Sequence, residues 1–130
     1  MIIVDASVLC AILLDEPERD QFVDLLTRGA NPLISPVNYW EAMVSMERRL
    51  GDSGAAHVER LCERANVRVA AMGQADTALA FNAWRSFGKG RHPAALNLGD
   101  CFAYALAKSR GMPLLFKGDD FPKTDVRSAL

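Results

Sequence analysis

The sequence predicts an α/β fold with a mostly parallel central sheet. Short apolar, β-branched segments alternate with longer helical segments along the chain, as in strands joined by helical crossovers. The first of these segments, residues 1–4, is apolar at every position, as expected of a strand that helices cover on both faces. At 130 residues the chain has the size of one domain with one core. We therefore expect a single domain over residues 1–130.

The order of the elements follows from turn and capping residues. Strands are expected at residues 1–4, 32–35, 67–69 and 114–116, with a short edge strand near Val126. Helices are expected at residues 6–14, 17–28, 36–50, 54–65, 74–87 and 98–110. Pro17 can start the second helix, and the pair Ser35-Pro36 is a strong start signal for the third. Gly29 and Gly51 follow helical segments and are expected to end them.

The composition excludes several classes of protein. The net charge of −1 creates no general attraction to nucleic acid or anionic membranes. The three cysteines are an odd number without zinc-site spacing, which indicates reduced thiols rather than a disulfide framework. The longest apolar run, residues 8–14, is too short for a membrane span, and the N-terminus lacks a signal peptide pattern. We expect a cytoplasmic protein with no membrane association.

Carboxylates follow two of the predicted strands. Asp5 comes directly after the first strand, and Asp119 and Asp120 follow the strand at residues 114–116. In open α/β sheets, ligands bind beyond the carboxyl ends of the strands. Asp5 could equally cap the next helix, and the Asp119-Asp120 pair could form a solvated turn.

Two further acids lie on predicted helices. Glu41 lies beyond the first turn of its helix on a largely apolar surface, where a buried ionised glutamate would need a partner or a cation. The alternative is a partly exposed glutamate at the edge of an apolar stripe. Asp100 falls in the first turn of its helix and could form a capping box with Asn97, which could also support a site by hydrogen bonding.

A doubly wound topology could bring all four acidic positions to one edge of the sheet. Several carboxylates close together repel and raise one another's pKa, and a hard divalent cation removes this conflict. A site made only of oxygen ligands suits Mg²⁺ or Mn²⁺ rather than zinc. Hydrolysis of a phosphodiester is the reaction that such a site performs best.

Cationic or titratable side chains occur near the acids in the sequence, namely Arg48, Arg49, Lys89, Arg91 and His92. They could contact the phosphates of a nucleic acid beside the metal. A solvated surface explains them equally well.

The complete acidic pattern resembles the PIN-domain ribonucleases, in particular the VapC toxins of bacterial toxin–antitoxin pairs. The resemblance rests on MIIVDASVL, SPVNYWEA, LNLGDCFAYALA and PLLFKGDDF in this order, and it covers Ile2 to Phe121. It implies a three-layer α/β/α sandwich with an acidic, Mg²⁺- or Mn²⁺-dependent site. Asp5, Glu41 and Asp100 match the acids of the family.

The same resemblance implies roles for individual residues. Asp5 and Asp100 would be the direct metal ligands, and Ser7 would support Asp5. Many relatives place the fourth acid where this chain has Gly118. Asp119 is our choice for that role and Asp120 the reserve.

The resemblance also implies partners. A VapB-type antitoxin would insert an arginine among the carboxylates, and the substrate would be a structured RNA such as tRNA or ribosomal RNA. A homodimer is expected. The apolar segments 9–14 and 22–26 could form a groove for an amphipathic partner helix, although they could also be ordinary core.

Three alternatives compete with a nuclease. A haloacid-dehalogenase-like phosphatase would use Asp5 as nucleophile, but it needs a second aspartate where Ser7 stands. A signalling receiver domain would fit Lys117 but needs an acceptor aspartate after the third strand, where the sequence reads AAMGQ. A non-catalytic PIN fold used only for binding would have less reason to keep every expected acid.

Overall fold

The computed structural model describes residues 1–130, and its elements alternate as the sequence predicts. The strands are β1 (Ile3–Val4), β2 (Leu33–Ile34), β3 (Arg68–Val69) and β4 (Leu114–Leu115). The helices are α1 (Ala6–Leu13), α2 (Arg19–Thr27), α3 (Pro36–Leu50), α4 (Gly54–Ala65), α5 (Gln74–Phe87) and α6 (Leu98–Arg110), followed by the 3₁₀ helix η1 (Phe121–Lys123). The four strands are all parallel and lie in the order β3-β2-β1-β4.

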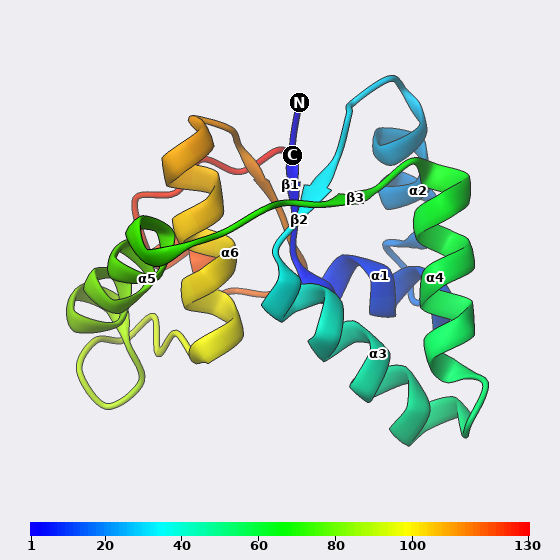
Figure 1. Ribbon diagram of the computed structural model, residues 1–130, viewed down its shortest axis with the longest axis horizontal. Helices are drawn as coiled ribbons and strands as arrows, with labels where there is room; N and C mark the ends of the chain where they lie inside the picture. Colours follow the sequence, from blue (N-terminus) through cyan, green and yellow to red (C-terminus); the bar gives the residue numbers. More distant parts are fainter.

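The sheet separates two helical layers, which confirms the three-layer α/β/α prediction. Helices α1 to α4 cover one face, and α5 with α6 covers the other (Figure 1). Because side chains alternate along a strand, Ile3 belongs to the cluster under α5 and α6, whereas Val4 belongs to the cluster under α1 to α4. Leu114 and Leu115 divide in the same way. All four are fully buried, so apolar residues at every position of these strands reflect two covered faces.

Local capping signals place most of the helix ends correctly. The Ser35 hydroxyl accepts the N–H of Asn38 at 2.9 Å, and Pro36 occupies the first turn of α3. Gly51 ends α3 with a φ of 84°, which a residue without Cβ adopts without strain. The predicted start of α2 was wrong by two residues, because Pro17 lies in a turn and the helix begins at Arg19.

The strands are shorter than predicted, with two residues each. The edge strand expected near Val126 is reduced to a single bridge between Leu114 and Ser128. In the segments 9–14 and 22–26, Leu9, Ile12, Phe22 and Leu26 are buried in the core under α1 to α4. Ile12 and Leu13 also line a pocket beside α4, so the groove for a partner helix stays a prediction. None of the helices combines the length and the hydropathy that crossing a membrane requires.

Candidate active site

Asp5 lies where β1 ends and α1 begins, at the carboxyl edge of the sheet (Figure 1). Its backbone N–H donates to the Leu115 carbonyl at 3.0 Å, which fixes it against the neighbouring strand β4. One carboxylate oxygen accepts the N–H of Ser7 at 3.1 Å, so Asp5 does cap α1. The side chain is 6% exposed. Capping therefore explains how Asp5 is held, but a buried carboxylate is a costly choice for a cap alone.

Ser7 connects Asp5 to the end of β4. Its hydroxyl oxygen accepts the N–H of Lys117 at 3.0 Å, which ties the first turn of α1 to the chain after β4. Burial raises the pKa of Asp5, and hydrogen bonds from Ser7 and from the Ala6 N–H oppose that rise only in part. The supporting role predicted for Ser7 is consistent with these contacts.

Glu41 is positioned by Asn38, a residue that sequence reasoning missed. Asn38 is fully buried, and its side-chain N–H₂ group donates to Glu41 Oε1 and to the Gly99 carbonyl, both at 2.9 Å. It thereby joins α3 to the first turn of α6. The available signal in the sequence was a polar residue three positions before Glu41 in the mostly apolar first half of the helix, which places both residues on the same face.

Gly99 makes room for the Glu41 carboxylate. A Cβ at position 99 would lie 2.1 Å from both carboxylate oxygens of Glu41, far inside van der Waals contact. Burial raises the pKa of Glu41, the Asn38 hydrogen bond lowers it, and the negative charge of Asp5 raises it. Glu41 is thus held between α3 and α6, and it lies close enough to Asp5 for the charge of Asp5 to raise its pKa.

Asp100 lies in the first turn of α6 and forms the predicted capping box with Asn97. Its Oδ2 accepts the Asn97 N–H at 3.1 Å, and Asn97 Oδ1 accepts the Asp100 N–H at 2.9 Å. Burial raises the pKa of Asp100 to about 6, helped by the charges of Asp5, Glu41 and Asp120. Three acids from distant parts of the chain therefore act on this one carboxyl group.

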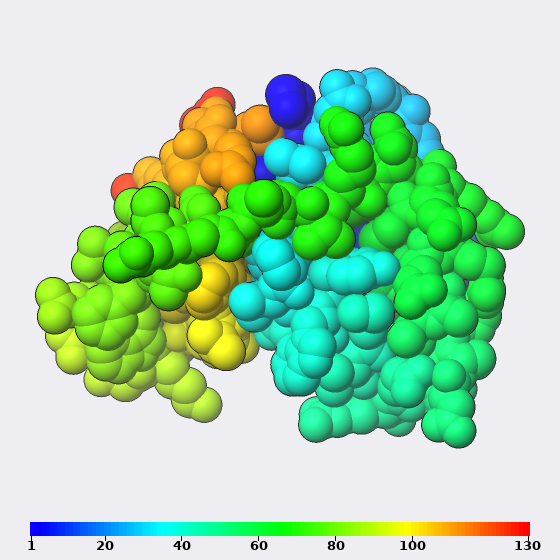
Figure 2. All heavy atoms as spheres, in the orientation of Figure 1, coloured from blue at the N-terminus to red at the C-terminus, as the bar shows by residue number.

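The acids share one pocket of about 550 Å³. Asp5, Glu41 and Asp100 all line it together with Ser7 and Asn97. Its remaining lining residues are Ala6, Cys10, Trp40, Val44, Ser45, Arg48 and Arg49. Figure 2 shows the surface hollowed between the yellow start of α6 and the cyan start of α3. We call this space the acid pocket.

The two candidates for the fourth acid differ in their relation to this pocket. Both Asp119 and Asp120 are exposed, and neither lines the acid pocket. Asp120 begins η1, and it is the charge of Asp120, rather than that of Asp119, that raises the pKa of Asp100. The interaction favours Asp120, while the role of Asp119 stays a prediction.

No cation of the chain lies within 4 Å of the three acids, although Arg48 and Arg49 line the same pocket. Every ion pair within 4 Å involves other carboxylates. No three carboxylates, imidazoles or thiolates lie close enough together to enclose an ion. Mg²⁺ is commonly held by only one or two carboxylates and keeps several waters. An open pocket whose oxygen donors form no ion pair within the chain therefore fits a hard divalent cation.

Comparison with known proteins gives a consistent result. The PIN domain family matches residues 2–127. Ribonuclease VapC30 of Mycobacterium tuberculosis is 44% identical over 126 residues, covering 95% of each chain. Ribonuclease VapC of Mycolicibacterium smegmatis is 41% identical over 124 residues, covering 95% of this chain and 96% of that one. The chain belongs to the PIN domain family and, at this level of identity, to its VapC ribonucleases.

A solved structure supports the fold independently. The crystal structure of Mycobacterium tuberculosis VapC20, described as a sarcin-ricin loop cleaving toxin, matches with a TM-score of 0.78 at 17% identity. The match covers 97% of this chain and 96% of that one. The phosphatase and receiver-domain alternatives have no support from the fold or from the family.

Proposed function

We propose that this protein is the ribonuclease toxin of a toxin–antitoxin pair and hydrolyses phosphodiester bonds in structured RNA, such as tRNA or ribosomal RNA. The observation that carries the proposal is the acid pocket: Asp5, Glu41 and Asp100 come from three separate elements, line one space and form no ion pair within 4 Å. Relatives over nearly the whole chain are named VapC ribonucleases.

Asp5 and Asp100 would hold Mg²⁺, or Mn²⁺ in its place. When bound, the ion would supply positive charge that stabilises the charge developing on the phosphate oxygens. Glu41 would complete the shell of the ion or position the attacking water. Asn38 holds Oε1 of that carboxylate, which limits its orientation. Asp120, or Asp119 as first predicted, would add negative charge at the rim.

The partners follow from the family and stay proposals. A VapB-type antitoxin would silence the site by placing an arginine among the unpaired acids, since a guanidinium pairs strongly with carboxylates. We further propose that the protein forms homodimers and acts in the cytoplasm, where tRNA and ribosomal RNA are found.

Cleavage of total tRNA and ribosomal RNA tests the function. The purified protein is incubated with Mg²⁺, with Mn²⁺ and with EDTA, next to Asp5→Asn purified identically. Asparagine keeps the capping oxygen and the shape of the side chain while removing its charge. Asp52→Asn, an exposed aspartate in the turn before α4, controls for loss of one negative charge elsewhere.

Discrete fragments that require the metal, vanish with Asp5→Asn and persist with Asp52→Asn are the expected result. Equal fragments from wild type and Asp5→Asn would contradict the proposed site. Binding of RNA without cleavage under any metal condition would favour the non-catalytic PIN fold instead.

A further inference from the structure

Two arginines share the acid pocket with the three acids. Arg48 and Arg49 lie in the last turn of α3, and both line the pocket. Both side chains are exposed, and neither forms an ion pair within 4 Å. The other cationic or titratable residues that the sequence places near the acids do not line the pocket, namely Lys89, Arg91 and His92.

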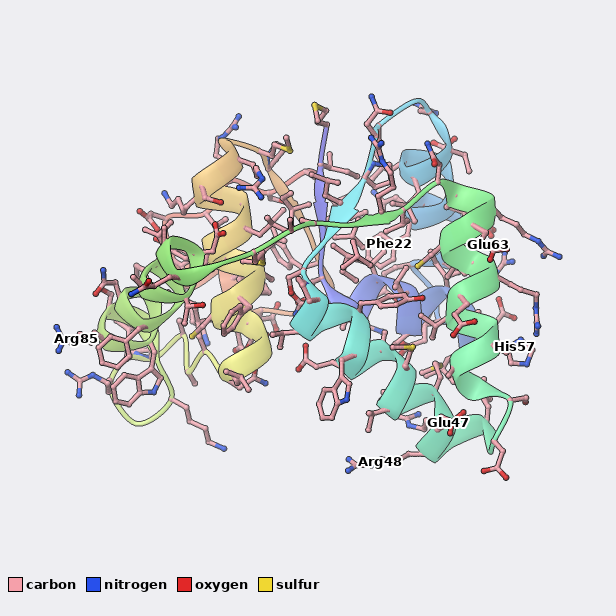
Figure 3. The ribbon with its side chains drawn as sticks, in the orientation of Figure 1. Phe22, Glu47, Arg48, His57, Glu63 and Arg85 are labelled. Carbon is pink, nitrogen blue, oxygen red and sulfur yellow. The ribbon has the colours of Figure 1, made fainter.

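Helical spacing places a cation on the same face of α3 as Glu41. Glu41, Ser45 and Arg49 follow one another at intervals of four residues, so they share one face of the helix. All three line the acid pocket. In Figure 3, the neighbouring Arg48 extends from the end of α3 away from α4, whereas Glu47 lies toward α4. Helix α3 therefore presents a carboxylate from its first half and cations from its end to one pocket.

The same helix keeps the two kinds of charge apart. Glu41 and Arg49 are separated by about 12 Å along the axis of α3, at the usual rise per residue. Burial raises the pKa of the Cys10 thiol on α1, and a hydrogen bond with Ser45 lowers it. The charge of Asp5 raises the same pKa, and the charge of Arg49 lowers it. The pocket therefore has an acidic end and a basic end, and Cys10 lies near both.

A strand of RNA matches a pocket of this kind. A divalent ion held by the acids would attract one phosphate, and the arginines would attract another. Consecutive phosphates of one strand lie about 3.4 Å apart along a stacked helix and farther apart in an extended strand, so about 12 Å spans two or three nucleotides. A guanidinium suits such a contact because it can donate two parallel hydrogen bonds to one phosphate.

We propose that Arg48 and Arg49 bind the RNA backbone at a phosphate about two or three nucleotides from the scissile one. This inference rests on the proposed ribonuclease function and specifies how its substrate is held. Contacts to phosphates carry no sequence information directly, but they fix the register of a strand. The arginines thereby place the scissile phosphate at the acids, whatever the neighbouring bases are.

Two other roles for the arginines are separated from phosphate binding by controls. Cations in the last turn of a helix interact favourably with its dipole, which would explain Arg48 and Arg49 without any ligand. Arg64 is the matched control, because it is exposed in the last turn of α4 and does not line the acid pocket. An acidic segment of a protein partner could also pair with the arginines, but the three acids of the same pocket would repel it.

Binding of RNA in EDTA tests the contact without cleavage. Fluorescence anisotropy measures the affinity for a labelled single-stranded RNA of mixed sequence at a series of salt concentrations. Each phosphate contact contributes about 0.7 to the slope of log affinity against log salt. Arg48→Gln/Arg49→Gln should therefore reduce the slope by about 0.7 to 1.4 and weaken binding at low salt about tenfold. Arg48→Lys/Arg49→Lys keeps both charges and should keep the slope, and Arg64→Gln should leave it unchanged.

Cleavage kinetics separate binding from a purely structural role. With Mg²⁺, Arg48→Gln/Arg49→Gln should raise the RNA concentration for half-maximal cleavage about tenfold and leave the maximal rate within about threefold. The reason is that a contact to a distant phosphate is made equally in the ground state and in the transition state. Thermal unfolding of each variant is recorded in parallel, so that damage to α3 is detected directly.

Several outcomes would overturn the inference. These are an unchanged slope in Arg48→Gln/Arg49→Gln, an equal reduction in Arg64→Gln, and a loss of maximal rate without a change in slope. Release of a copurified acidic protein by the double variant, with RNA binding intact, would assign the arginines to a protein contact instead. A wild type whose RNA binding follows these expectations but never cleaves would refute the proposed function, whereas cleavage with unchanged slopes would refute only the phosphate contact.

Discussion

Two groups of carboxylates lie near the carboxyl ends of the central strands. One group forms ion pairs with a lysine of the chain, and the other forms none. Glu16 and Glu18, between α1 and α2, both pair with Lys117 after β4, at 2.7 and 3.3 Å. Asp5, Glu41 and Asp100 have no cationic partner within 4 Å. Burial raises the pKa of all three, and the negative charge of Asp5 adds to the rise for Glu41 and Asp100. The two groups are joined through α1 and through the hydrogen bond from Lys117 to Ser7.

The contrast shows what a carboxylate contributes in each setting. The paired group connects the turn before α2 to the chain after β4, and Lys117 offsets part of its negative charge. The unpaired group costs folding free energy, because ionised carboxylates are removed from water and placed near one another. Such an arrangement is expected where the balancing charge arrives with a ligand, and this reasoning separates functional acids from structural ones.

The largest expected effect comes from neutralising an unpaired acid. Asp100→Asn should reduce RNA cleavage by about 100-fold or more, because several kcal/mol of charge stabilisation depend on the ion that it helps to hold. The amide can still accept the Asn97 N–H, so the start of α6 should remain intact. Glu18→Gln is the matched change in the paired group and should leave cleavage within about twofold. Equal losses in the two variants would remove the distinction between the groups.

The next largest effect is a loss of stability when Asn38, which holds the Glu41 carboxylate in place, is replaced. Asn38→Ala should destabilise the protein by about 2–3 kcal/mol, because it leaves the Gly99 carbonyl and Glu41 without their buried donor. Chemical denaturation measures the free energy of unfolding. Asn82→Ala, an exposed asparagine on α5, is the control and should change it by less than about 0.5 kcal/mol. An Asn38→Ala variant with an unchanged free energy of unfolding would mean that a water molecule replaces the hydrogen bonds of the Asn38 amide.

A smaller effect is expected from pH. The pKa of Asp100 rises from 3.8 to about 6 in the folded protein, so the folded state binds more protons than the unfolded state between these values. The contribution of the protonated Asp100 carboxyl group to the free energy of unfolding is therefore fully present below pH 4, and it is lost as the pH rises through about 6. For a partly exposed group we expect a loss of about 1–2 kcal/mol.

Thermal unfolding in EDTA between pH 4 and 7 measures this loss. Asp100→Asn should flatten the profile. Addition of Mg²⁺ at pH 7 should raise the melting temperature, and the increase should shrink towards pH 5 as the carboxyl group becomes protonated. A profile that Asp100→Asn leaves unchanged would show that another group titrates.

The smallest effect concerns the rim of the acid pocket. Asp120→Asn should lower the pKa of Asp100 and change cleavage by about threefold, because an exposed charge acts through solvent. Asp119→Asn should have less effect on that pKa. NMR titration of the Asp100 carboxyl carbon measures both variants. A larger shift with Asp119→Asn would restore Asp119 as the fourth acid.

Local signals in the sequence predicted much of the fold. The capping pair Ser35-Pro36, the capping box of Asn97 with Asp100 and the glycine at position 51 act over a few residues, so they place helix ends without knowledge of the tertiary structure. The start of α2 was misplaced because its preceding turn is held by Lys117, about 100 residues away in sequence. Asn38 escaped notice for the same reason, since it donates to Gly99 across 61 positions.

The sequence by itself determined which acids exist, in what order they follow the strands and which helices begin beside them. It also carried the resemblance to the PIN-domain ribonucleases, which the family match confirms. Only the tertiary structure decided that Glu16 and Glu18 share a lysine while Asp5, Glu41 and Asp100 share a pocket. The reason is physical: the ionisation of a carboxylate depends on burial and on charges within a few ångströms, and the parallel sheet brings those charges from distant parts of the chain.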